Sequence, residues 1–340
     1  MASSGNDPLV EISGLCVDFS TRQHRARALH GIDLVVRRGE ALGIVGESGC
    51  GKSITWMAAL GLLGDNAQVS GSVTFDGIPL LGLPEPQLNA IRGGRVAMIF
   101  QDPSSSLNPL HQIGWQLVEA LALHRNLRGE AARKEAERLL DRVGIANARR
   151  RLGEYPHEFS GGMNQRVMIA MALAGDPELL VADEPTTALD ATIQAQILDL
   201  LEDLRNERQM ALVLISHDLG MVSEMTDRVV VMYSGRVVED TPTDMLFDRP
   251  SHPYTRGLIA ALPDLAGPRR RLVAIPGNVP APDNLPTGCF FAPRCAAAMT
   301  SCSRHVPALR QVGRDARHHA ACLLVPAATT PVHASAEAVS

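Results

Sequence analysis

Short apolar runs alternate with helical patterns over the first part of the chain. Ala41–Val45 and Ala211–Ile215 are continuous apolar runs of strand length, which is typical of strands buried on both faces of a sheet. Apolar residues at three- and four-residue spacing over Ala191–Arg208 predict an amphipathic helix that packs against such a sheet. Because strands that alternate with helices favour a mostly parallel sheet, we predict an α/β domain from Leu9 to about Glu239.

Two segments depart from this alternation. Between Asp102 and Asp176 the strand pattern disappears, and Glu130–Val143 has the pattern of a charged amphipathic helix that Gly144 caps. Past Thr241, closely spaced prolines interrupt every long element. The predicted organisation is a main domain over 1–245 with an inserted helical subdomain at about 102–176, a small loop-rich C-terminal module over 246–325, and a disordered tail over 326–340.

The charge pattern argues against nucleic acid as a partner. The formal net charge is −5 and no long basic run occurs, whereas binding to a phosphate backbone requires a clustered positive face. Only Lys52 and Lys134 are lysines among the 32 basic residues, so a lysine at position 52 stands out against a background of arginine.

No targeting or membrane-spanning segment is predicted. The first residues lack the basic region and the apolar stretch of a signal peptide. No apolar run reaches the roughly 18 residues that indicate a membrane span. We therefore expect a cytosolic chain, in which disulfides are not expected.

A glycine-rich loop between a predicted strand and a predicted helix carries the clearest chemistry. Residues 46–53 (GESGCGKS) fit the pattern G-x-x-x-x-G-K-[ST], with the strand before them and a helix from about Lys52 to Leu62 after them. Backbone N–H groups of such a loop form an anion nest at a helix N-terminus. Lys52 then places its charge on the terminal phosphates of a nucleotide, and the Ser53 hydroxyl reaches Mg²⁺. We interpret Cys50 as a filler of a variable position rather than a redox group. The predicted phosphate-binding residues are Gly46, Glu47, Ser48, Gly49, Cys50, Gly51, Lys52 and Ser53.

Two adjacent acids follow a second buried strand. Leu179–Ala182 is a run of four apolar residues that leads directly into Asp183 and Glu184. The carboxyl ends of strands in an open sheet border the crevice where ligands bind. We predict that Asp183 belongs to the Mg²⁺ shell and that Glu184 polarises the attacking water.

With these motifs in place, the chain resembles the nucleotide-binding domains of ABC transporters. Ser160-Gly161-Gly162-Met163 resembles the signature motif of that family, with Ser160 as the cap of the next helix. The resemblance implies a P-loop NTPase fold and an ATPase in which the signature motif contacts the ATP of a second subunit, so that two domains enclose two nucleotides.

The same resemblance assigns further residues to the site. Gln101 resembles the Q-loop glutamine, which contacts Mg²⁺, and His217 resembles the switch histidine. Phe19 is the candidate for the aromatic residue that stacks on adenine. It lies two residues before the usual place, where Thr21 stands, so a plain core role is the alternative. The residues that resemble the D-loop are Ala188, Leu189 and Asp190.

A narrower resemblance, from about Val10 to Val325, is to the ATP-binding subunits of dipeptide and oligopeptide permeases. It is carried by QDP and SLNP (residues 101–109), by FSGGMNQRVMIAMAL (159–173) and by SHPYTRGL (251–258). It implies a translocase subunit on the cytoplasmic face of the inner membrane that powers peptide uptake. The implied partners are a second ABC ATPase, either a homologue or a copy, two transmembrane permease subunits and an extracytoplasmic substrate-binding protein.

Other functions remain open at this point. Nickel or another small solute is an alternative cargo, because the cargo is chosen by other subunits. An alternative of another class is a soluble ABC protein of translation or DNA repair, although such proteins carry two cassettes or a long coiled coil, and this chain has one cassette and no sustained heptads. A third is a metal-sensing regulatory subunit in which ATP hydrolysis is incidental.

Four cysteines gather near the C-terminus, at positions 289, 295, 302 and 322. Their spacing matches neither a zinc ribbon nor the compact ferredoxin pattern. This proline-rich segment has few apolar residues with which to build a hydrophobic core. Its cysteines, Cys289, Cys295, Cys302 and Cys322, therefore still suggest a bound metal that stabilises the segment in place of such a core. Some peptide-permease subunits that the segment resembles carry a [4Fe–4S] cluster there, so we predict this cluster. The alternatives are Zn²⁺, with His305, His318 or His319 as a substitute ligand, and four free thiols.

Overall fold

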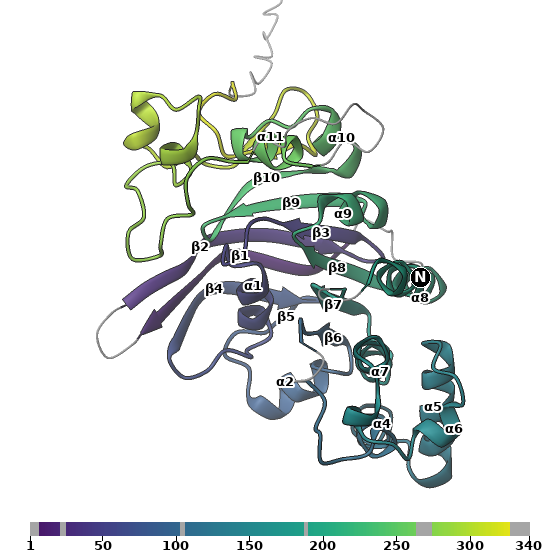
Figure 1. Ribbon diagram of the computed structural model, residues 1–340. Coiled ribbons are helices and arrows are strands. Elements are labelled where there is room, and N and C mark those ends of the chain that lie inside the picture. Colours follow the sequence, from purple (N-terminus) through teal and green to yellow (C-terminus); the bar gives the residue numbers. More distant parts are fainter. Residues whose placement is uncertain (1–6, 21–24, 103–105, 187–189, 263–273, 327–340) are drawn as a thin grey trace, which may run out of the picture.

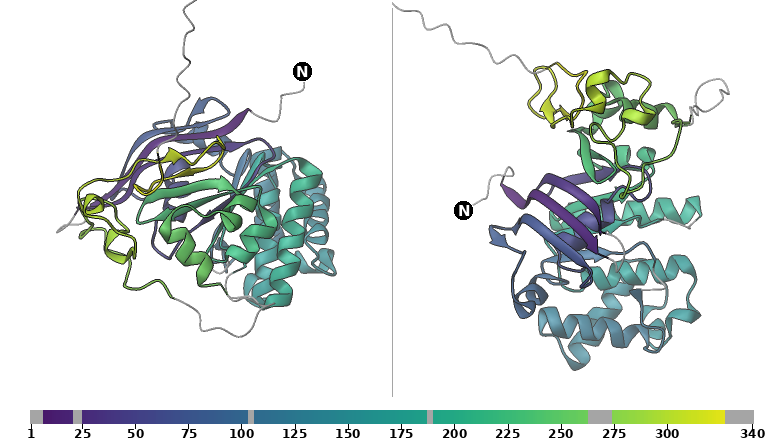
Figure 2. Two further views of the ribbon diagram at one scale, coloured as in Figure 1. Left: turned by 90° about the horizontal axis from the view of Figure 1, so that it is seen from above. Right: turned by 90° about the vertical axis from the view of Figure 1, so that its left-hand side faces the viewer.

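The computed structural model describes residues 7–20, 25–102, 106–186, 190–262 and 274–326. Its elements form three levels, which the right-hand view of Figure 2 separates. The helices within residues 113–173 lie at one end, two β-sheets lie in the middle, and the C-terminal segment (residues 274–326), which adds two short strands to the larger sheet, lies at the other end.

The larger sheet has eight strands in the order β11-β12-β10-β9-β3-β8-β7-β6. Figure 1 labels the strands from β10 to β6. β3 pairs in parallel with β8 and β9, and β7 pairs in parallel with β8 and β6. The predicted apolar strands are β3 and β8, and every residue of both is buried, as expected for strands covered on two faces. The prediction of a mostly parallel sheet is therefore confirmed for these central strands. The strands of this sheet are β3 (Ala41–Val45), β6 (Val96–Ile99), β7 (Leu179–Asp183), β8 (Ala211–Ser216), β9 (Arg228–Tyr233), β10 (Arg236–Pro242), β11 (Arg310–Gln311) and β12 (His319–Ala320).

The smaller sheet is antiparallel, which the sequence analysis did not predict. Its order is β2-β1-β4-β5. Long strands paired along their length, with register shifts that bend them, keep one face on the core and leave the other in solvent. The strands are β1 (Pro8–Ser20), β2 (Arg25–Arg37), β4 (Ala67–Phe75) and β5 (Ile78–Pro79).

The described residues between β6 and β7 form helices and no strand. The helix predicted at Glu130–Val143 is α5 (Gly129–Arg142), and Gly144 follows it with φ +76°, the conformation expected of a C-terminal cap. The boundaries of a separate helical subdomain at 102–176 remain a prediction. The remaining helices are α1 (Lys52–Ala59), α2 (Glu85–Ile91), α4 (Ile113–Arg125), α6 (Ala148–Arg151), α7 (Gly161–Leu173), α8 (Ala191–Arg208), α9 (Leu219–Met225), α10 (Thr243–Asp248) and α11 (Pro253–Ala260), with short 3₁₀ helices at Pro156–Glu158, Ala292–Arg294 and Thr300–Ser303.

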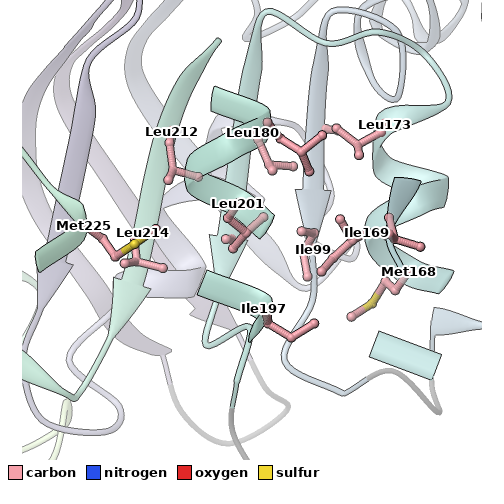
Figure 3. Packing of buried hydrophobic residues seen from close by; sticks show 14 of the residues in the cluster. Ile99, Met168, Ile169, Leu173, Leu180, Ile197, Leu201, Leu212, Leu214 and Met225 are labelled. Carbon is pink, nitrogen blue, oxygen red and sulfur yellow. The ribbon is translucent and has the colours of Figure 1, made fainter. Parts of the chain in front are cut away.

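Helices α7 and α8 are fixed to the larger sheet by a buried apolar layer, which Figure 3 shows from close by. Ile169 from α7 and Leu201 from α8 are fully buried, as is Leu180 on β7. Burying each such side chain stabilises the fold by about 1.5–3 kcal/mol. The start of each helix is therefore held in a fixed place relative to the ends of the strands. The labelled side chains of this layer are Ile99, Met168, Ile169, Leu173, Leu180, Ile197, Leu201, Leu212, Leu214 and Met225.

A buried carboxylate ties the C-terminal segment to the larger sheet. Glu239 on β10 is fully buried and accepts hydrogen bonds from the backbone N–H groups of Ser251 (2.7 Å) and His252 (2.9 Å). The ring of His318 lies 2.8 Å from the same carboxylate. Burial alone raises the pKa of Glu239, but the hydrogen bonds from His318 and from the two backbone N–H groups help to lower it. The carboxylate therefore stays charged and joins three separate stretches of chain.

Candidate functional site

Four parallel strands end at one edge of the larger sheet. β3, β8, β7 and β6 are neighbours in this order, and their registers place Val45 opposite Ser216 and Ile99 opposite Ala182. The loops that follow parallel strands meet at the same edge, where open sheets bind ligands. The structure thus brings together the predicted phosphate-binding loop, His217, the acid pair and Gln101, which are far apart in sequence.

The phosphate-binding loop has the backbone that its glycines allow. Gly46 has φ +154° and Gly51 has φ +100°. A Cβ atom at Gly46 would lie 2.3 Å from the carbonyl oxygen of Met232, and one at Gly51 would lie 2.6 Å from Cδ2 of Leu29. Glycine is therefore required at both positions. The loop leads into the N-terminus of α1, where Lys52 is 6% exposed and its Nζ donates to the Gly46 carbonyl at 2.8 Å.

Asp183 lies beside the first turn of α1. Burial raises the pKa of its carboxyl group, and the charge of Glu184 acts in the same direction. A hydrogen bond from the Ser53 hydroxyl and the charge of Lys52 act against this rise. Asp183 and Ser53 are adjacent oxygen donors, which is the ligand type that Mg²⁺ prefers, so these residues fit a magnesium ion.

Glu184 has an unusual backbone conformation. Its φ is +47°, in the left-handed region that a residue with a Cβ rarely adopts, and its N–H donates to the Ile215 carbonyl at 2.9 Å. Oε2 accepts a hydrogen bond from Gln101 Nε2 at 2.9 Å, and Oε1 lies 3.4 Å from His217 Nδ1. Residues from the ends of three strands therefore meet at one carboxylate, and the strained backbone aims it there. The sequence analysis missed this strain.

The signature residues lie at a second place, the N-terminus of α7. The Ser160 Oγ accepts a hydrogen bond from the Met163 N–H at 3.3 Å, so the predicted cap is confirmed. Ser160, Gly161, Gly162 and Met163 line a cavity of about 610 Å³ together with Asp190. Among the described residues that border this cavity, none belongs to the phosphate-binding loop.

Only part of the predicted D-loop can be placed. Ala188 and Leu189 lie outside the described residues. Asp190 caps α8, because its Oδ1 accepts hydrogen bonds from the N–H groups of Thr192 (3.1 Å) and Ile193 (3.0 Å). Asp190 therefore belongs both to the lining of the cavity at the signature residues and to the start of α8.

Phe19 lies at a cavity next to the phosphate-binding loop. This cavity, of about 390 Å³, is lined by Phe19, by Ser48 and Gly49 of the loop, and by 279–282 and Leu285 of the C-terminal segment. An aromatic ring beside an apolar pocket is suited to a flat base. Thr21, the alternative position, lies outside the described residues. The contribution of the C-terminal segment was not predicted, since no motif marks it.

Two further residues that the sequence analysis did not assign to the site contact the phosphate-binding loop. The Glu47 N–H donates to the Tyr254 hydroxyl at 2.9 Å, and Arg294 forms an ion pair with the Glu47 carboxylate at 2.6 Å. Tyr254 lies in the segment SHPYTRGL, and Arg294 lies between two of the cysteines. Only the fold reveals that they reach the loop.

The C-terminal cysteines share one small cavity, of about 10 Å³, which all four of them line. Backbone N–H groups point at two of the sulfurs: Met299 N–H lies 3.4 Å from the Sγ of Cys302, and Leu324 N–H lies 3.5 Å from that of Cys322. Burial raises the pKa of the Cys289 thiol and that of Cys322. Within the described ranges, however, no group of three or more His, Cys, Asp or Glu residues is placed to hold a metal ion, so the structure does not support the predicted metal centre.

The structure also places two of the candidate zinc ligands and Cys50. His318, a candidate zinc ligand, is engaged with Glu239 in the core. The ring of His305 lies 3.2 Å from the Ser301 carbonyl oxygen. Burial raises the pKa of the Cys50 thiol, which agrees with its interpretation as a filler of the loop rather than a reactive group.

Comparisons with known proteins fix the family. Residues 29–187 match the family model described as "ABC transporter", and residues 238–302 match "Oligopeptide/dipeptide transporter, C-terminal region". The chain is 49% identical to the oligopeptide transport ATP-binding protein OppD of Haemophilus influenzae, over 87% of this chain and 92% of that protein. The chain belongs to the ABC transporter ATPases. It is also 48% identical to OppD of Escherichia coli, over 90% of this chain and 91% of that protein.

A solved structure supports the same assignment for this ABC ATPase. The dimeric, post-hydrolysis state of the ATP-binding cassette MJ0796 bound to ADP and Pi matches it with a TM-score of 0.62 and 28% identity. The match covers 69% of this chain and 98% of that one. In the part of the chain that the structure describes, no helix is long and apolar enough to cross a membrane.

Proposed function

We propose that this ABC ATPase binds and hydrolyses MgATP to power the import of dipeptides or oligopeptides. The observation that carries the ATPase part is the meeting of the phosphate-binding loop, Asp183, Glu184, Gln101 and His217 at the ends of four parallel strands. The peptide cargo is supported by the match of residues 238–302 and by the names of the relatives.

Each residue at this edge of the larger sheet has its own role in the proposed reaction. The loop N–H groups and Lys52 bind the phosphates. Ser53 and Asp183 would hold Mg²⁺, and Gln101 would contact the same ion. When bound, Mg²⁺ neutralises charge on the phosphates. Glu184 orients and polarises the water, and His217, at 3.4 Å from its carboxylate, keeps that carboxylate in place. Positioning and charge stabilisation supply most of the rate enhancement.

We propose that Phe19 stacks on the adenine in the cavity of about 390 Å³. Its ring borders this cavity together with Ser48 and Gly49, so a base held there places its phosphates toward the loop. Residues 279–282 and Leu285 of the C-terminal segment add apolar side chains to the same lining.

We propose that the active unit contains two ATPase subunits. The signature residues 160–163 and Asp190 border a cavity of their own, at the N-terminus of α7, where backbone N–H groups suit a phosphate. A second subunit, copy or homologue, would bring its ATP to this cavity. The dimeric state of the similar solved cassette supports this arrangement.

We propose that the permease subunits dock beside Gln101, at the cytoplasmic face of the membrane. An apolar cavity of about 270 Å³ there is lined by Phe100, Leu107, Met168 and Met171. Phe100 directly precedes Gln101, so docking at the cavity is transmitted to the catalytic edge. Helix α4 adds the exposed Trp115 (50%), and the helices between β6 and β7 would pass the motion to the permeases. An extracytoplasmic binding protein would deliver the peptide.

Transport by the assembled complex tests the function. The chain is co-produced with its permeases, partner ATPase and binding protein, and uptake of labelled dipeptide, labelled oligopeptide and ⁶³Ni²⁺ into proteoliposomes is measured with and without MgATP. We expect ATP-dependent uptake of at least one peptide and none of nickel. Nickel uptake without peptide uptake would refute the cargo assignment while keeping the ATPase.

We propose that the four C-terminal cysteines hold a [4Fe–4S] cluster, with zinc as the second choice. The support is their shared cavity and the N–H groups directed at the sulfurs of Cys302 and Cys322, since such hydrogen bonds favour thiolates. The role is structural or regulatory.

Metal analysis of anaerobically purified protein tests this proposal. We expect iron and acid-labile sulfide near four each per chain, with a broad visible absorption. One zinc without sulfide would replace the cluster by a zinc site. The absence of iron, sulfide and zinc would leave four free thiols and refute both forms.

A further inference from the structure

We propose that Arg294, with the help of Tyr254, positions the phosphate-binding loop by clamping Glu47. Both residues lie C-terminal to the strands that carry the catalytic groups. Arg294 and Tyr254 are positioning residues, because they act on ATP through the loop. The proposal rests on the ATPase activity stated above and adds two residues to what controls its affinity for nucleotide.

The Arg294 guanidinium binds the Glu47 carboxylate through two of its nitrogens. One terminal nitrogen lies 2.6 Å from Oε2 and the other lies 2.9 Å from Oε1, which is the bidentate geometry that only arginine provides. The third nitrogen, Nε, donates to the Pro276 carbonyl at 2.9 Å. The side chain of Arg294 is 4% exposed and that of Glu47 is 30% exposed, so solvent screens this pair less than it screens a surface ion pair.

Glu47 is held on its backbone as well as on its side chain. Its N–H donates to the Tyr254 hydroxyl at 2.9 Å, and its carbonyl accepts a hydrogen bond from Lys52 Nζ at 3.2 Å. Burial raises the pKa of Tyr254, so its hydroxyl stays neutral at physiological pH. Glu47 therefore connects the phosphate-binding lysine directly to two groups outside the loop.

Aromatic packing fixes the clamp in place. The rings of Tyr233 and Tyr254 have centroids 4.7 Å apart, and Phe291 packs against them at 5.2 and 5.4 Å. The Arg294 guanidinium lies over the rings of Tyr233 and Phe291. A guanidinium held on three sides has little freedom, so it fixes the position of the carboxylate that it binds.

The same short stretch carries two of the cysteines. Cys289 and Cys295 flank Arg294, and between them Phe290 packs on the ring of His30 in β2 at 5.0 Å. The backbone N–H of Arg294 donates to the Phe291 carbonyl at 3.0 Å, within a single 3₁₀ turn. A displacement of the cysteine-bearing stretch must therefore displace the guanidinium. The nucleotide affinity is coupled in this way to the position of residues 289–295.

A double-mutant cycle in the full-length protein tests the clamp. Glu47→Gln, Arg294→Gln and the double variant are compared with the wild type by titration with fluorescent MgATP and by steady-state ATPase kinetics. We expect each single variant to raise the Kd and KM for ATP about tenfold, the size that indirect contacts reach, with kcat changed less than about twofold. The double variant should be no weaker than either single variant, because both remove the same contact.

Matched variants separate positioning from folding. Arg294→Lys keeps the positive charge but loses the pair of parallel N–H donors, so its affinity for ATP should lie between those of Arg294→Gln and the wild type. Arg304→Gln removes an exposed arginine of the same segment and should leave the Kd unchanged. His318→Ala loosens the segment at Glu239, far along the chain from Glu47, and should lower thermal stability more than affinity.

The outcomes distinguish the clamp from the ATPase assignment. Wild-type affinity in both single variants, or additive losses in the double variant, would overturn the clamp alone. If His318→Ala lost as much affinity for ATP as Arg294→Gln, the effect of Arg294→Gln would come from the general integrity of the fold. This result would also overturn the clamp. Wild-type protein that fails to bind MgATP would overturn the ATPase assignment, and the clamp with it.

Discussion

Glu184→Gln is expected to bind MgATP and to hydrolyse it at least about a hundredfold more slowly than the wild type, the usual contribution of a general base. The amide has the shape of the carboxylate and can still accept the hydrogen bond from Gln101, now 2.9 Å long. It lacks the negative charge that polarises water, and it removes the charge that faces His217. Binding of ATP should be retained, because the loop and Lys52 are unchanged.

The measurement is the ATPase rate together with the mass of the protein in MgATP. In the proposed two-subunit arrangement, ATP that is bound but not hydrolysed would hold the two halves of the site together, so the variant should accumulate as a closed dimer. Glu224→Gln, which changes an exposed acid on α9, is the matched control and should behave as the wild type. Turnover within about twofold of the wild type would assign the water to another residue.

The meeting of the predicted site residues at one edge of the larger sheet was predictable because each of their motifs is local. A glycine-rich loop after an apolar run and an acid pair after another such run need only the rule that parallel strands end at one edge. The sequence could not show which strands are neighbours, and the order β3-β8-β7-β6 is what brings Gln101 within 2.9 Å of Glu184. The strained φ of Glu184 is equally invisible, because nothing in its local sequence demands it.

The parts that escaped prediction depend on contacts between distant stretches of chain. The antiparallel sheet arises from the pairing of β1 with both β2 and β4, and strand partners are chosen by packing rather than by propensity. Arg294 lies 247 residues after Glu47, so no spacing rule could connect them. The cysteines are a different case: their pattern indicated a metal, and this stays a proposal, because the described residues contain no group placed to hold one.

Lys52→Ala is expected to abolish detectable ATP binding and, in the assembled transporter, all ATP-dependent uptake. Lys52 is 6% exposed and its Nζ donates to the Gly46 and Glu47 carbonyls, at 2.8 and 3.2 Å. The ammonium is thus held at the phosphate-binding loop, where it supplies a positive charge for the terminal phosphates. Losing two charge-assisted hydrogen bonds to phosphate costs roughly 3 kcal/mol or more, which is about a hundredfold or more in affinity.

Two further substitutions make the Lys52 result specific. Lys134→Ala removes the other lysine of the chain, which is exposed on α5, and should leave binding and uptake unchanged. Lys52→Arg keeps the charge but places a wide planar group where a compact ammonium fits, so it should fail as the alanine variant does. ATP affinity is measured by titration with fluorescent MgATP, and folding by thermal melting. The described hydrogen bonds of Lys52 Nζ reach only groups of the loop, the Gly46 and Glu47 carbonyls and the Cys50 sulfur, so its loss should leave the fold intact. Normal uptake by a folded Lys52→Ala protein would contradict the ATPase assignment itself.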